Sequence, residues 1–382
     1  MEKFSAFRDP GTGIQPFLTP VPPVGSNILA NVLLPFGYVV GILRITLILA
    51  LAAIYAILVQ GVCLILTPVP PLYRAVSYVI TALLARLVLL LVGLWWIPVE
   101  QVTRKRARGS KLSESWNPKA GDLIVPNWAS WIEILWLAFR FDPIFTLPVS
   151  SPVDLTTSTS QSSTPVTSTP GRRTGTGSAA ISSPSTRKAT PRASIVGFRP
   201  VSLLSMILAT GNVPLDSESC KDYLSLEEIR SKADRPVVVF PECTTSNGRG
   251  LLRFADVFKG VDVPVKKFKV FLMCVRYDPP TALAPTLSQS IPSSTLNPLM
   301  HIFKLTTSFL PLTLSIRLLA PSESPSSGSF LLSDFLTGGH YEDPLSECCA
   351  ALIAQIGKFK RTGLGWEDKA AFLEFYRDKK RS

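Results

Sequence analysis

The amino-acid sequence predicts an α/β domain preceded by membrane-embedded helices. Two apolar segments near the N-terminus indicate the helices: residues 45–66 carry no charge, and residues 75–96 carry only Arg86. Residues 237–240, Val-Val-Val-Phe, indicate the α/β domain, because they read as a short buried strand that breaks at once into a polar, Gly-containing turn. Open α/β sheets bind their ligands at such turns, at the carboxyl ends of the strands.

The composition agrees with a membrane protein. The chain has 382 residues, of which 46% are hydrophobic, and its mean hydropathy is +0.29. The formal net charge of +12 suits an anionic partner such as membrane lipid or a phosphate-bearing substrate. No nucleic-acid-binding motif accompanies this charge, so we expect no nucleic-acid partner. The six cysteines have neither zinc-ligand spacing nor a disulfide pattern, so we expect reduced thiols and no metal site.

The N-terminal region divides into a tail and an anchor. Residues 1–27 form a polar, Pro-rich tail without the apolar core of a signal peptide, and residues 28–99 hold the membrane-anchoring helices. As a helix, residues 45–66 are about 33 Å long, close to the hydrocarbon thickness. Their insertion is favoured by about 4–8 kcal/mol. Arg44 precedes this segment and could extend to the lipid headgroups.

The second apolar segment carries one charged residue near its middle, which bears on its depth in the membrane. The three prolines within residues 67–74 must end the first helix. The apolar side chains of residues 75–96 favour insertion by about 4–7 kcal/mol, and the central Arg86 costs about 2.5–3.5 kcal/mol. The segment therefore either completes a hairpin or lies at the interface. We expect one span or a hairpin.

A basic cluster follows the second segment and sets the expected orientation. Its members occur without an intervening acidic residue and are Arg104, Lys105, Arg106, Arg108 and Lys111. Because cytoplasmic flanks are enriched in Lys and Arg, this side is expected to face the cytosol.

The remaining chain reads as a domain with one insertion. Residues 100–149 form its first part and residues 195–382 its remainder, with a C-terminal helix. Between them, residues 150–194 are rich in Ser, Thr and Pro and have almost no large apolar residues, which predicts a disordered insertion. Strands are expected at residues 121–126, 142–148, 237–240 and 269–277, and helices after Glu133 and at residues 344–359 and 364–380.

Two motifs lie at the ends of expected strands. Residues 127–133, Asn-Trp-Ala-Ser-Trp-Ile-Glu, follow the first strand, and residues 240–249, Phe-Pro-Glu-Cys-Thr-Thr-Ser-Asn-Gly-Arg, follow the third. The second motif offers a carboxylate, hydroxyls and backbone N–H groups, and Arg249 adds a cation suited to a phosphate.

The second motif resembles a sequence block of the glycerolipid acyltransferases, the PlsC superfamily, in the lysophosphatidic acid acyltransferase branch of fungi and animals. This resemblance implies a PlsC-type domain with a mixed sheet flanked by helices. It also implies that the following residues bind the substrate and its phosphate: Glu242, Thr244, Thr245, Ser246, Asn247, Gly248 and Arg249. Cys243 replaces a family glycine, which implies a different backbone or a narrower site.

The first motif matches the family's catalytic block except at one position. Asn127 and Ser130 match, and Glu133 stands at the acidic position, but Trp128 replaces the catalytic histidine. An indole N–H is only a donor and cannot accept a proton from a substrate hydroxyl. Glu133 is therefore the candidate general base, provided that its pKa is raised and the hydroxyl lies within hydrogen-bond reach. Trp128 is expected to pack beside the pocket.

Other family positions agree less well. Arg276 ends the strand that is similar to the fourth family block, and we expect it in the pocket with Asn127, Trp128 and Ser130. At the second block Ser217 replaces a phosphate-binding arginine, so the phosphate contact could come from Arg199, Arg235 or Arg249. The chain's two histidines, His301 and His340, lie outside the family's base position; His301 is expected to be structural.

The resemblance implies that the protein transfers an acyl group from acyl-CoA to a lysophospholipid, with lysophosphatidic acid the first expectation. Acyl-CoA is then a co-substrate, no cofactor is required, and the partners are membrane phospholipid and lysophospholipid. The expected location is the endoplasmic reticulum membrane or the lipid droplet, with the domain facing the cytosol. The alternative is a catalytically inactive, acyltransferase-like membrane or lipid-droplet adaptor, since Trp128 replaces the histidine. The sequence leaves the oligomeric state open.

Overall fold

The computed structural model describes residues 4–23, 28–103, 114–152, 192–336 and 341–381. Its α-helices are α1 (Ile28–Gln60), α2 (Pro70–Val92), α3 (Ile132–Phe141), α4 (Leu203–Leu208), α5 (Leu226–Lys232), α6 (Leu299–Thr306), α7 (Pro344–Gly357) and α8 (Trp366–Arg381). Its strands are β1 (Val99–Val102), β2 (Leu123–Pro126), β3 (Ile144–Ser150), β4 (Ile195–Val201), β5 (Leu215–Asp216), β6 (Val237–Val238), β7 (Gly250–Leu251), β8 (Val270–Tyr277), β9 (Leu314–Leu319) and β10 (Lys360–Arg361). Short 3₁₀ helices occur at Ser5–Phe7, Val62–Leu66, Pro321–Glu323 and Leu332–Asp334.

The strands form one large mixed sheet, as the sequence predicts. Its order is β1-β9-β8-β2-β6-β3-β4, and β5 pairs with β3. The central strands β8, β2, β6 and β3 are parallel, whereas β9 and β4 run antiparallel to their neighbours β8 and β3. The expected α/β class with a mixed sheet flanked by helices is confirmed.

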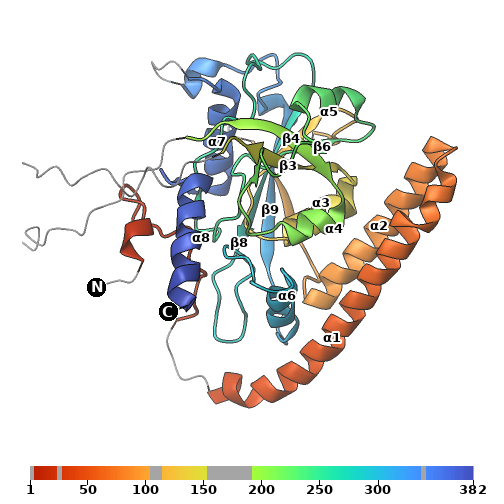
Figure 1. The fold of residues 1–382 in the computed structure, drawn as a ribbon, viewed down its shortest axis with the longest axis vertical. Helices are drawn as coiled ribbons and strands as arrows, with labels where there is room; N and C mark the ends of the chain where they lie inside the picture. The colour runs from red at the N-terminus through yellow and green to blue at the C-terminus, as the bar shows by residue number, and fades with distance from the viewer. Residues whose placement is uncertain (1–3, 24–27, 104–113, 153–191, 337–340, 382) are drawn as a thin grey trace, which may run out of the picture.

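Helices cover both faces of this sheet (Figure 1). On β8, Met273 and Val275 enter a core that includes α3 and the N-terminal helices, whereas Leu272 and Cys274 enter a second core that includes α7. This alternation follows from the two-residue period of a strand. The first motif opens α3 and therefore lies on the face that carries the N-terminal helices.

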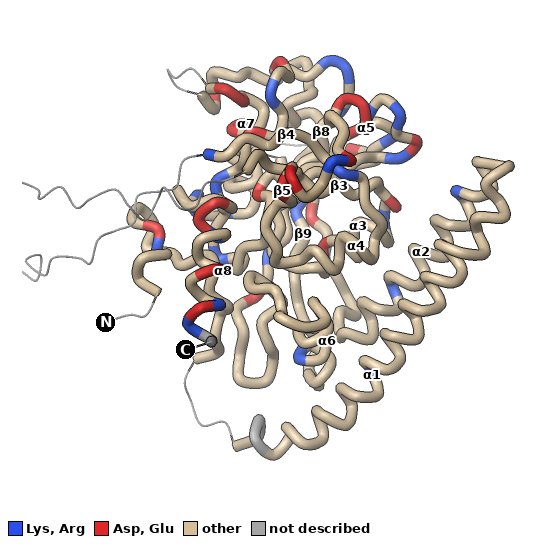
Figure 2. Tube along the Cα trace, in the orientation of Figure 1, with Lys and Arg blue, Asp and Glu red and all other residues tan. Residues whose placement is uncertain are grey.

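The two N-terminal helices form an apolar hairpin that lies along the domain (Figure 1). Both are long and apolar enough to cross a membrane, by length and composition. They pack against α3 and α6, and Ile48 and Leu89 are buried in the same core as Trp128. The outer face of α1 remains exposed, for example at Ile42 (58%) and Ile57 (63%). Figure 2 shows that charges are sparse along the hairpin and gather on the domain.

Arginines within the hairpin bond to backbone carbonyls. Arg44 donates to the carbonyl oxygens of Thr306 (3.2 Å) and Ser308 (2.7 Å) in the domain, which contrasts with the expectation that it extends to headgroups. Arg86 donates to the carbonyl oxygens after α2, at Leu94 (3.2 Å) and Trp95 (2.6 Å). These bonds reduce the cost of placing a guanidinium in an apolar segment, because charged groups there pair with backbone carbonyls.

The first turns of α2, which follow the tip of the hairpin, also contact the domain. Beyond the turn after α1, Arg74 forms an ion pair of 2.7 Å with Asp234. Nearby, the Tyr78 hydroxyl donates to the Arg140 carbonyl at 3.4 Å. The hairpin therefore contacts the α/β domain near its tip as well as along its length, whereas the tip itself is exposed, for example at Ile65 (76%).

The N-terminal segment, residues 4–23, packs on the domain although the sequence reads as a polar tail. Phe7 and Phe17 are buried, and their rings lie 5.2 and 5.6 Å from the ring of Phe372 in α8. Asp9 accepts a hydrogen bond of 2.8 Å from the Gly363 backbone. The few aromatic residues of this segment thus provide its attachment.

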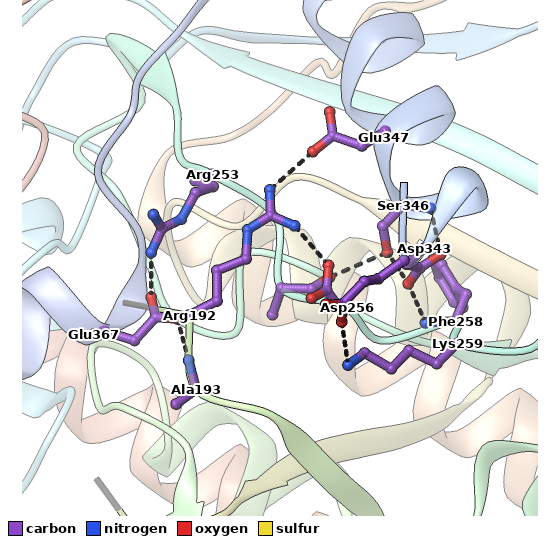
Figure 3. Close-up of polar contacts among 12 residues, drawn as sticks. Arg192, Ala193, Arg253, Asp256, Phe258, Lys259, Asp343, Ser346, Glu347 and Glu367 are labelled. Carbon is purple, nitrogen blue, oxygen red and sulfur yellow. Dashed lines mark hydrogen bonds and ion pairs between the residues drawn. The ribbon is translucent and has the colours of Figure 1, made fainter. Parts of the chain in front are cut away.

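Three features of the sequence lie outside the described residues: the basic cluster at residues 104–111, most of the low-complexity insertion, and His340. The described chain resumes at Arg192, which pairs with Asp256 (2.8 Å) and Glu347 (3.1 Å), as Figure 3 shows. The next residue, Ala193, donates to Glu367 at 3.0 Å. These contacts lie beside a charged cavity of about 240 Å³. They anchor the end of the insertion to α7 and α8.

Candidate active site

The two sequence motifs meet because β2 and β6 are parallel neighbours. Residues 127–133 follow β2 and residues 239–249 follow β6, so both leave the same edge of the sheet. This edge is where parallel α/β sheets place their binding sites. The structure therefore brings the first and second motifs together. Both contribute to the hydrophobic core that also includes residues of the N-terminal hairpin.

Trp128 lies at the centre of this arrangement as a packing residue. Its side chain is 1% exposed, and its ring lies 4.7 Å from that of Phe240. The indole Nε1 donates to the Ser130 carbonyl at 3.2 Å. The backbone N–H of Trp128 donates to Glu242 Oε1 at 2.8 Å, and its carbonyl accepts from Ser246 N at 3.0 Å. An indole in this position binds the two motifs together but takes up no proton.

Glu133 is enclosed by hydrogen-bond donors. Its Oε1 accepts from the backbone N–H groups of Ala129 (2.5 Å) and Ser130 (2.7 Å), and its other oxygen accepts from the Tyr277 hydroxyl. The residue is 1% exposed. Burial raises the pKa of Glu133 to about 7, although the three hydrogen bonds favour the charged form. The first of the two conditions for Glu133 as a base, a raised pKa, is thus present.

Glu242 is the second buried carboxyl group. Its two oxygens accept from Trp128 N (2.8 Å) and Leu252 N (3.1 Å), and the residue is fully buried. Burial raises the pKa of Glu242 to about 8, and the negative charge of Glu133 adds to this rise. The two carboxyl groups together hold the backbone of residues 128–130, because each accepts from N–H groups of that loop.

The turn after Glu242 uses its polar groups inside the protein. The hydroxyls of Thr244 and Thr245 donate to the carbonyls of Asn212 (2.7 Å) and Gln289 (2.6 Å). Ser246 Oγ accepts from the Gly248 backbone at 3.2 Å. These residues, which the resemblance implies to bind the substrate and its phosphate, build the turn in this conformation.

Asn247 joins this turn to the N-terminal segment. Its Nδ2 donates to the carbonyls of Gln15 (2.7 Å) and Leu18 (2.9 Å), and its backbone N–H donates to that of Pro16 (2.8 Å). Its Oδ1 accepts from Arg249 N at 3.1 Å. The N-terminal segment thus covers one side of the turn, which the sequence does not indicate.

The backbone at Cys243 resolves the question raised by the missing glycine. Its φ is +56°, in the left-handed region that favours glycine. The cysteine therefore keeps a glycine-like conformation, at a cost of about 1–2 kcal/mol. Its side chain is buried in the core next to α7.

Three arginines were candidates for a phosphate contact, and they lie in different places. Arg249 is exposed and belongs to the second motif itself. Arg199 is exposed on β4, a strand at the edge of the sheet. Arg235 pairs with Asp142 at 2.9 Å, before the start of β6. Of the three, Arg249 is the one that lies within the second motif.

Arg276 is not brought to Glu133, although the sequence predicts it in the pocket. It lies on the same face of β8 as Cys274, the face that packs toward α7. Its guanidinium lies 6.0 Å from the centre of the Phe359 ring. The neighbouring residue on the strand, Tyr277, contacts Glu133 instead.

Asn127 and Ser130 hold the loop after β2. The side chain of Asn127 exchanges two hydrogen bonds with the backbone of Val275, at 3.1 and 2.7 Å, and so extends the pairing of β2 with β8. Ser130 is fully buried beside Glu133. Both residues therefore lie at the site, as the sequence predicts, and Asn127 has a structural role.

His301 is bonded through both ring nitrogens. Its Nδ1 accepts from Trp131 Nε1 at 3.0 Å, and its Nε2 lies 3.0 Å from the Thr286 carbonyl, to which it donates. Burial lowers the pKa of His301 to about 4. A neutral imidazole that is hydrogen-bonded at both ring nitrogens agrees with the structural role expected for His301.

Two functional candidates are not indicated by the sequence motifs. Tyr277 donates to Glu133 and is partly exposed at the end of β8. Lys369 of α8 is fully buried, and its Nζ donates to the backbone oxygen of Thr245 (2.7 Å) and to its hydroxyl (3.2 Å). Burial lowers the pKa of Lys369 well below its usual value, and nearby Glu242 opposes this. Lys369 lies three residues after Trp366 and therefore on the same face of α8. This spacing could have indicated that Lys369 is buried.

Within the described ranges, no group of three or more His, Cys, Asp or Glu side chains could hold a metal ion. No protein-family model, curated protein or solved structure matches this chain. The function must therefore be inferred from the geometry of the site.

Proposed function

We propose that this chain is a membrane-bound, acyl-CoA-dependent acyltransferase of the glycerolipid (PlsC) type. It acylates a lysophospholipid, and the first substrate that we propose is lysophosphatidic acid, giving phosphatidic acid. The observation that carries the proposal is the pair of buried carboxyl groups, Glu133 and Glu242, beside the ends of neighbouring parallel strands. Titratable groups with strongly shifted pKa values gather at functional sites.

The chemistry needs a group that accepts the proton of the lysolipid hydroxyl as that oxygen attacks the thioester. General bases work best when their pKa lies near the operating pH, and the pKa of Glu133 is about 7. Glu242 holds the Trp128 backbone and so maintains the loop that orients Glu133. The exposed Arg249 supplies a cation for the substrate phosphate.

The apolar hairpin brings the site to the lipid. Trp128, Ile48 and Leu89 belong to one hydrophobic core, so the site and the hairpin pack against each other through this core. A lysolipid can then reach the domain without leaving the membrane surface. We propose the endoplasmic reticulum membrane or the lipid droplet as this surface, with the domain on the cytosolic side.

The position of the hairpin tip favours insertion from one side. Arg74 follows the tip and pairs with Asp234 of the domain, whereas a hairpin that crossed a bilayer would place its tip on the opposite face. We therefore propose that the hairpin does not cross the bilayer, so that its two ends and its tip all lie on the cytosolic side. Such an anchor also fits the single phospholipid layer of a lipid droplet.

One observation favours a second candidate function, that of an inactive adaptor. Trp128 stands at the position where the acyltransferase family has its catalytic histidine, and it packs on Phe240. The family's general base is therefore missing at this position. An adaptor of this kind binds lysolipid or membrane but forms no product.

The two candidates differ in product formation. The full chain, purified in detergent, is given radiolabelled oleoyl-CoA and lysophosphatidic acid, beside Glu133→Gln and Glu374→Gln variants. Glu374 is an exposed carboxylate on α8 and serves as the matched control. Labelled phosphatidic acid from the wild type and Glu374→Gln, but not from Glu133→Gln, supports the enzyme. Lysolipid binding without product from the wild type supports the adaptor.

A further inference from the structure

We propose that Tyr277 and Glu133 form a proton relay that takes the place of the absent imidazole, with Tyr277 as the residue that touches the substrate hydroxyl. This inference rests on the proposed acyltransferase function. It is carried by the hydrogen bond from the Tyr277 hydroxyl to Glu133 and by the difference in exposure between the two residues.

Glu133 cannot be reached directly in this conformation. One carboxylate oxygen is taken by Ala129 N and Ser130 N, the other by Tyr277, and the residue is 1% exposed. The two backbone donors hold their protons at any working pH, whereas a phenol can pass one on. Of the three donors, Tyr277 is therefore the one that can connect Glu133 with a bound hydroxyl.

The end of β8 places Tyr277 beside the turn that carries Arg249. A Cβ added to Gly248 would lie 3.5 Å from Tyr277 Cδ2 and 3.7 Å from the Ala129 side chain, so the turn passes directly next to the Tyr277 ring. Gly248 has φ +72°, which a glycine adopts without strain. The following residue is the exposed Arg249. Arg249, the proposed phosphate-binding residue, thus comes directly after the residue that packs next to the Tyr277 ring.

The proton relay returns to its starting protonation state after one turnover. The lysolipid hydroxyl gives its proton to Tyr277 Oη as the phenol proton moves to Glu133, and the lysolipid oxygen forms a bond with the thioester carbon. When the tetrahedral intermediate collapses, the carbon–sulfur bond breaks. The CoA thiolate takes the proton back from Glu133 through Tyr277. The products are the acylated lipid and free CoA thiol, and both side chains return to their starting states.

Burial and charge around the pair set the protonation of both groups before each turnover. Burial and the charge of Glu133 raise the pKa of Tyr277 well above its usual value, so the phenol stays protonated between turnovers. Burial places the pKa of Glu133 at about 7, and on the neighbouring Glu242 the charges of Glu133 and Lys369 act in opposite directions. Tyr277 therefore transmits the proton and Glu133 stores it.

The test is the Tyr277→Phe variant of the full chain, which keeps the ring and removes the hydroxyl. Its matched control is Tyr223→Phe, a partly exposed tyrosine next to β4, away from the site. With oleoyl-CoA and lysophosphatidic acid we expect kcat to fall about 10²–10⁴-fold in Tyr277→Phe, with KM and the control unchanged.

A wild-type measurement keeps the proposal testable if Tyr277→Phe folds poorly. The rate of acyl transfer is recorded in mixtures of light and heavy water; two protons in motion give a curved dependence on the heavy-water fraction. A linear dependence, or wild-type kcat in Tyr277→Phe, overturns the relay and leaves the acyltransferase standing. Absence of wild-type product overturns the acyltransferase, and the relay with it.

Discussion

Replacement of Glu242 by glutamine should change how stability depends on pH. In the folded protein burial raises the pKa of Glu242 from 4.5 to about 8. The folded state therefore binds the proton more tightly than the unfolded state. Stability from this group is complete below pH 4.5 and is lost as the pH rises through the folded pKa.

The size of the effect follows from the two pKa values. Each pH unit between them corresponds to about 1.4 kcal/mol, so the interval from 4.5 to about 8 corresponds to about 5 kcal/mol of unfolding free energy. Glutamine cannot ionise, so Glu242→Gln should lack this loss. It should also be less stable at low pH by about 1–3 kcal/mol, because one of the N–H groups of Trp128 and Leu252 loses its acceptor.

The assay is urea unfolding in detergent, followed by tryptophan fluorescence at about pH 5, 6.5 and 8, the interval between the two pKa values. Burial lowers the pKa of Lys369, so its effect on stability runs in the opposite direction. Lys369 and Glu133 are present in both proteins, so the difference between them isolates Glu242 and its coupling to these two groups. We expect the wild type to lose stability relative to Glu242→Gln as the pH rises. Parallel curves for the two proteins would refute the idea that Glu242 is buried and protonated at neutral pH.

Three further predictions concern other parts of the molecule. Phe17→Ala should lower the unfolding free energy by about 3–5 kcal/mol, since the ring is 1% exposed against Phe372; unchanged urea midpoints would show that the N-terminal segment is not docked. His301→Gln should reduce the loss of stability as the pH falls from 6.5 towards 4, because the pKa of His301 is lowered to about 4; an identical acid transition contradicts its burial. Thr67→Cys, at the exposed hairpin tip, should react with an impermeant maleimide added to the cytosolic side of sealed microsomes; protection until detergent is added would show a crossing hairpin.

Much of the fold follows from local sequence signals. The strands at Leu123–Pro126 and Val270–Tyr277 and the helices at Pro344–Gly357 and Trp366–Arg381 lie where periodicity predicts them. The prolines of residues 67–74 separate α1 from α2, although Pro70 begins α2, as a proline at the first position of a helix can. α1 begins at Ile28, earlier than the uncharged run, because Pro35 and Arg44 are both accommodated within it.

The candidate site follows from the sequence only in part. Its two motifs are recognisable because each follows a strand-like run, and β2 and β6 prove to be neighbours. Tyr277 could not be predicted, because nothing local marks a strand-end tyrosine as the partner of a carboxylate far away in the chain. The contact of Asn247 with Gln15 could not be predicted for the same reason, since it depends on tertiary packing.

For Arg276 the sequence predicts the strand correctly but not the face of the sheet on which the side chain lies. The sequence places it at the end of the correct strand, but its side chain alternates to the face that carries Phe359. A strand position one residue away, Tyr277, faces Glu133 instead. Which face a strand residue takes follows from register, and register is set by the neighbouring strands.

The pH dependence of acyl transfer, at saturating oleoyl-CoA and lysophosphatidic acid, is the most direct test of Glu133 as the group that receives the proton. We expect the wild-type rate to rise with pH and to level off above an apparent pKa near 7, the value that burial gives Glu133. Glu133→Gln should bind lysophosphatidic acid but show no turnover at any pH. Turnover retained in Glu133→Gln, or a wild-type rate that does not change from about two pH units below this pKa to about two above it, would contradict the assignment.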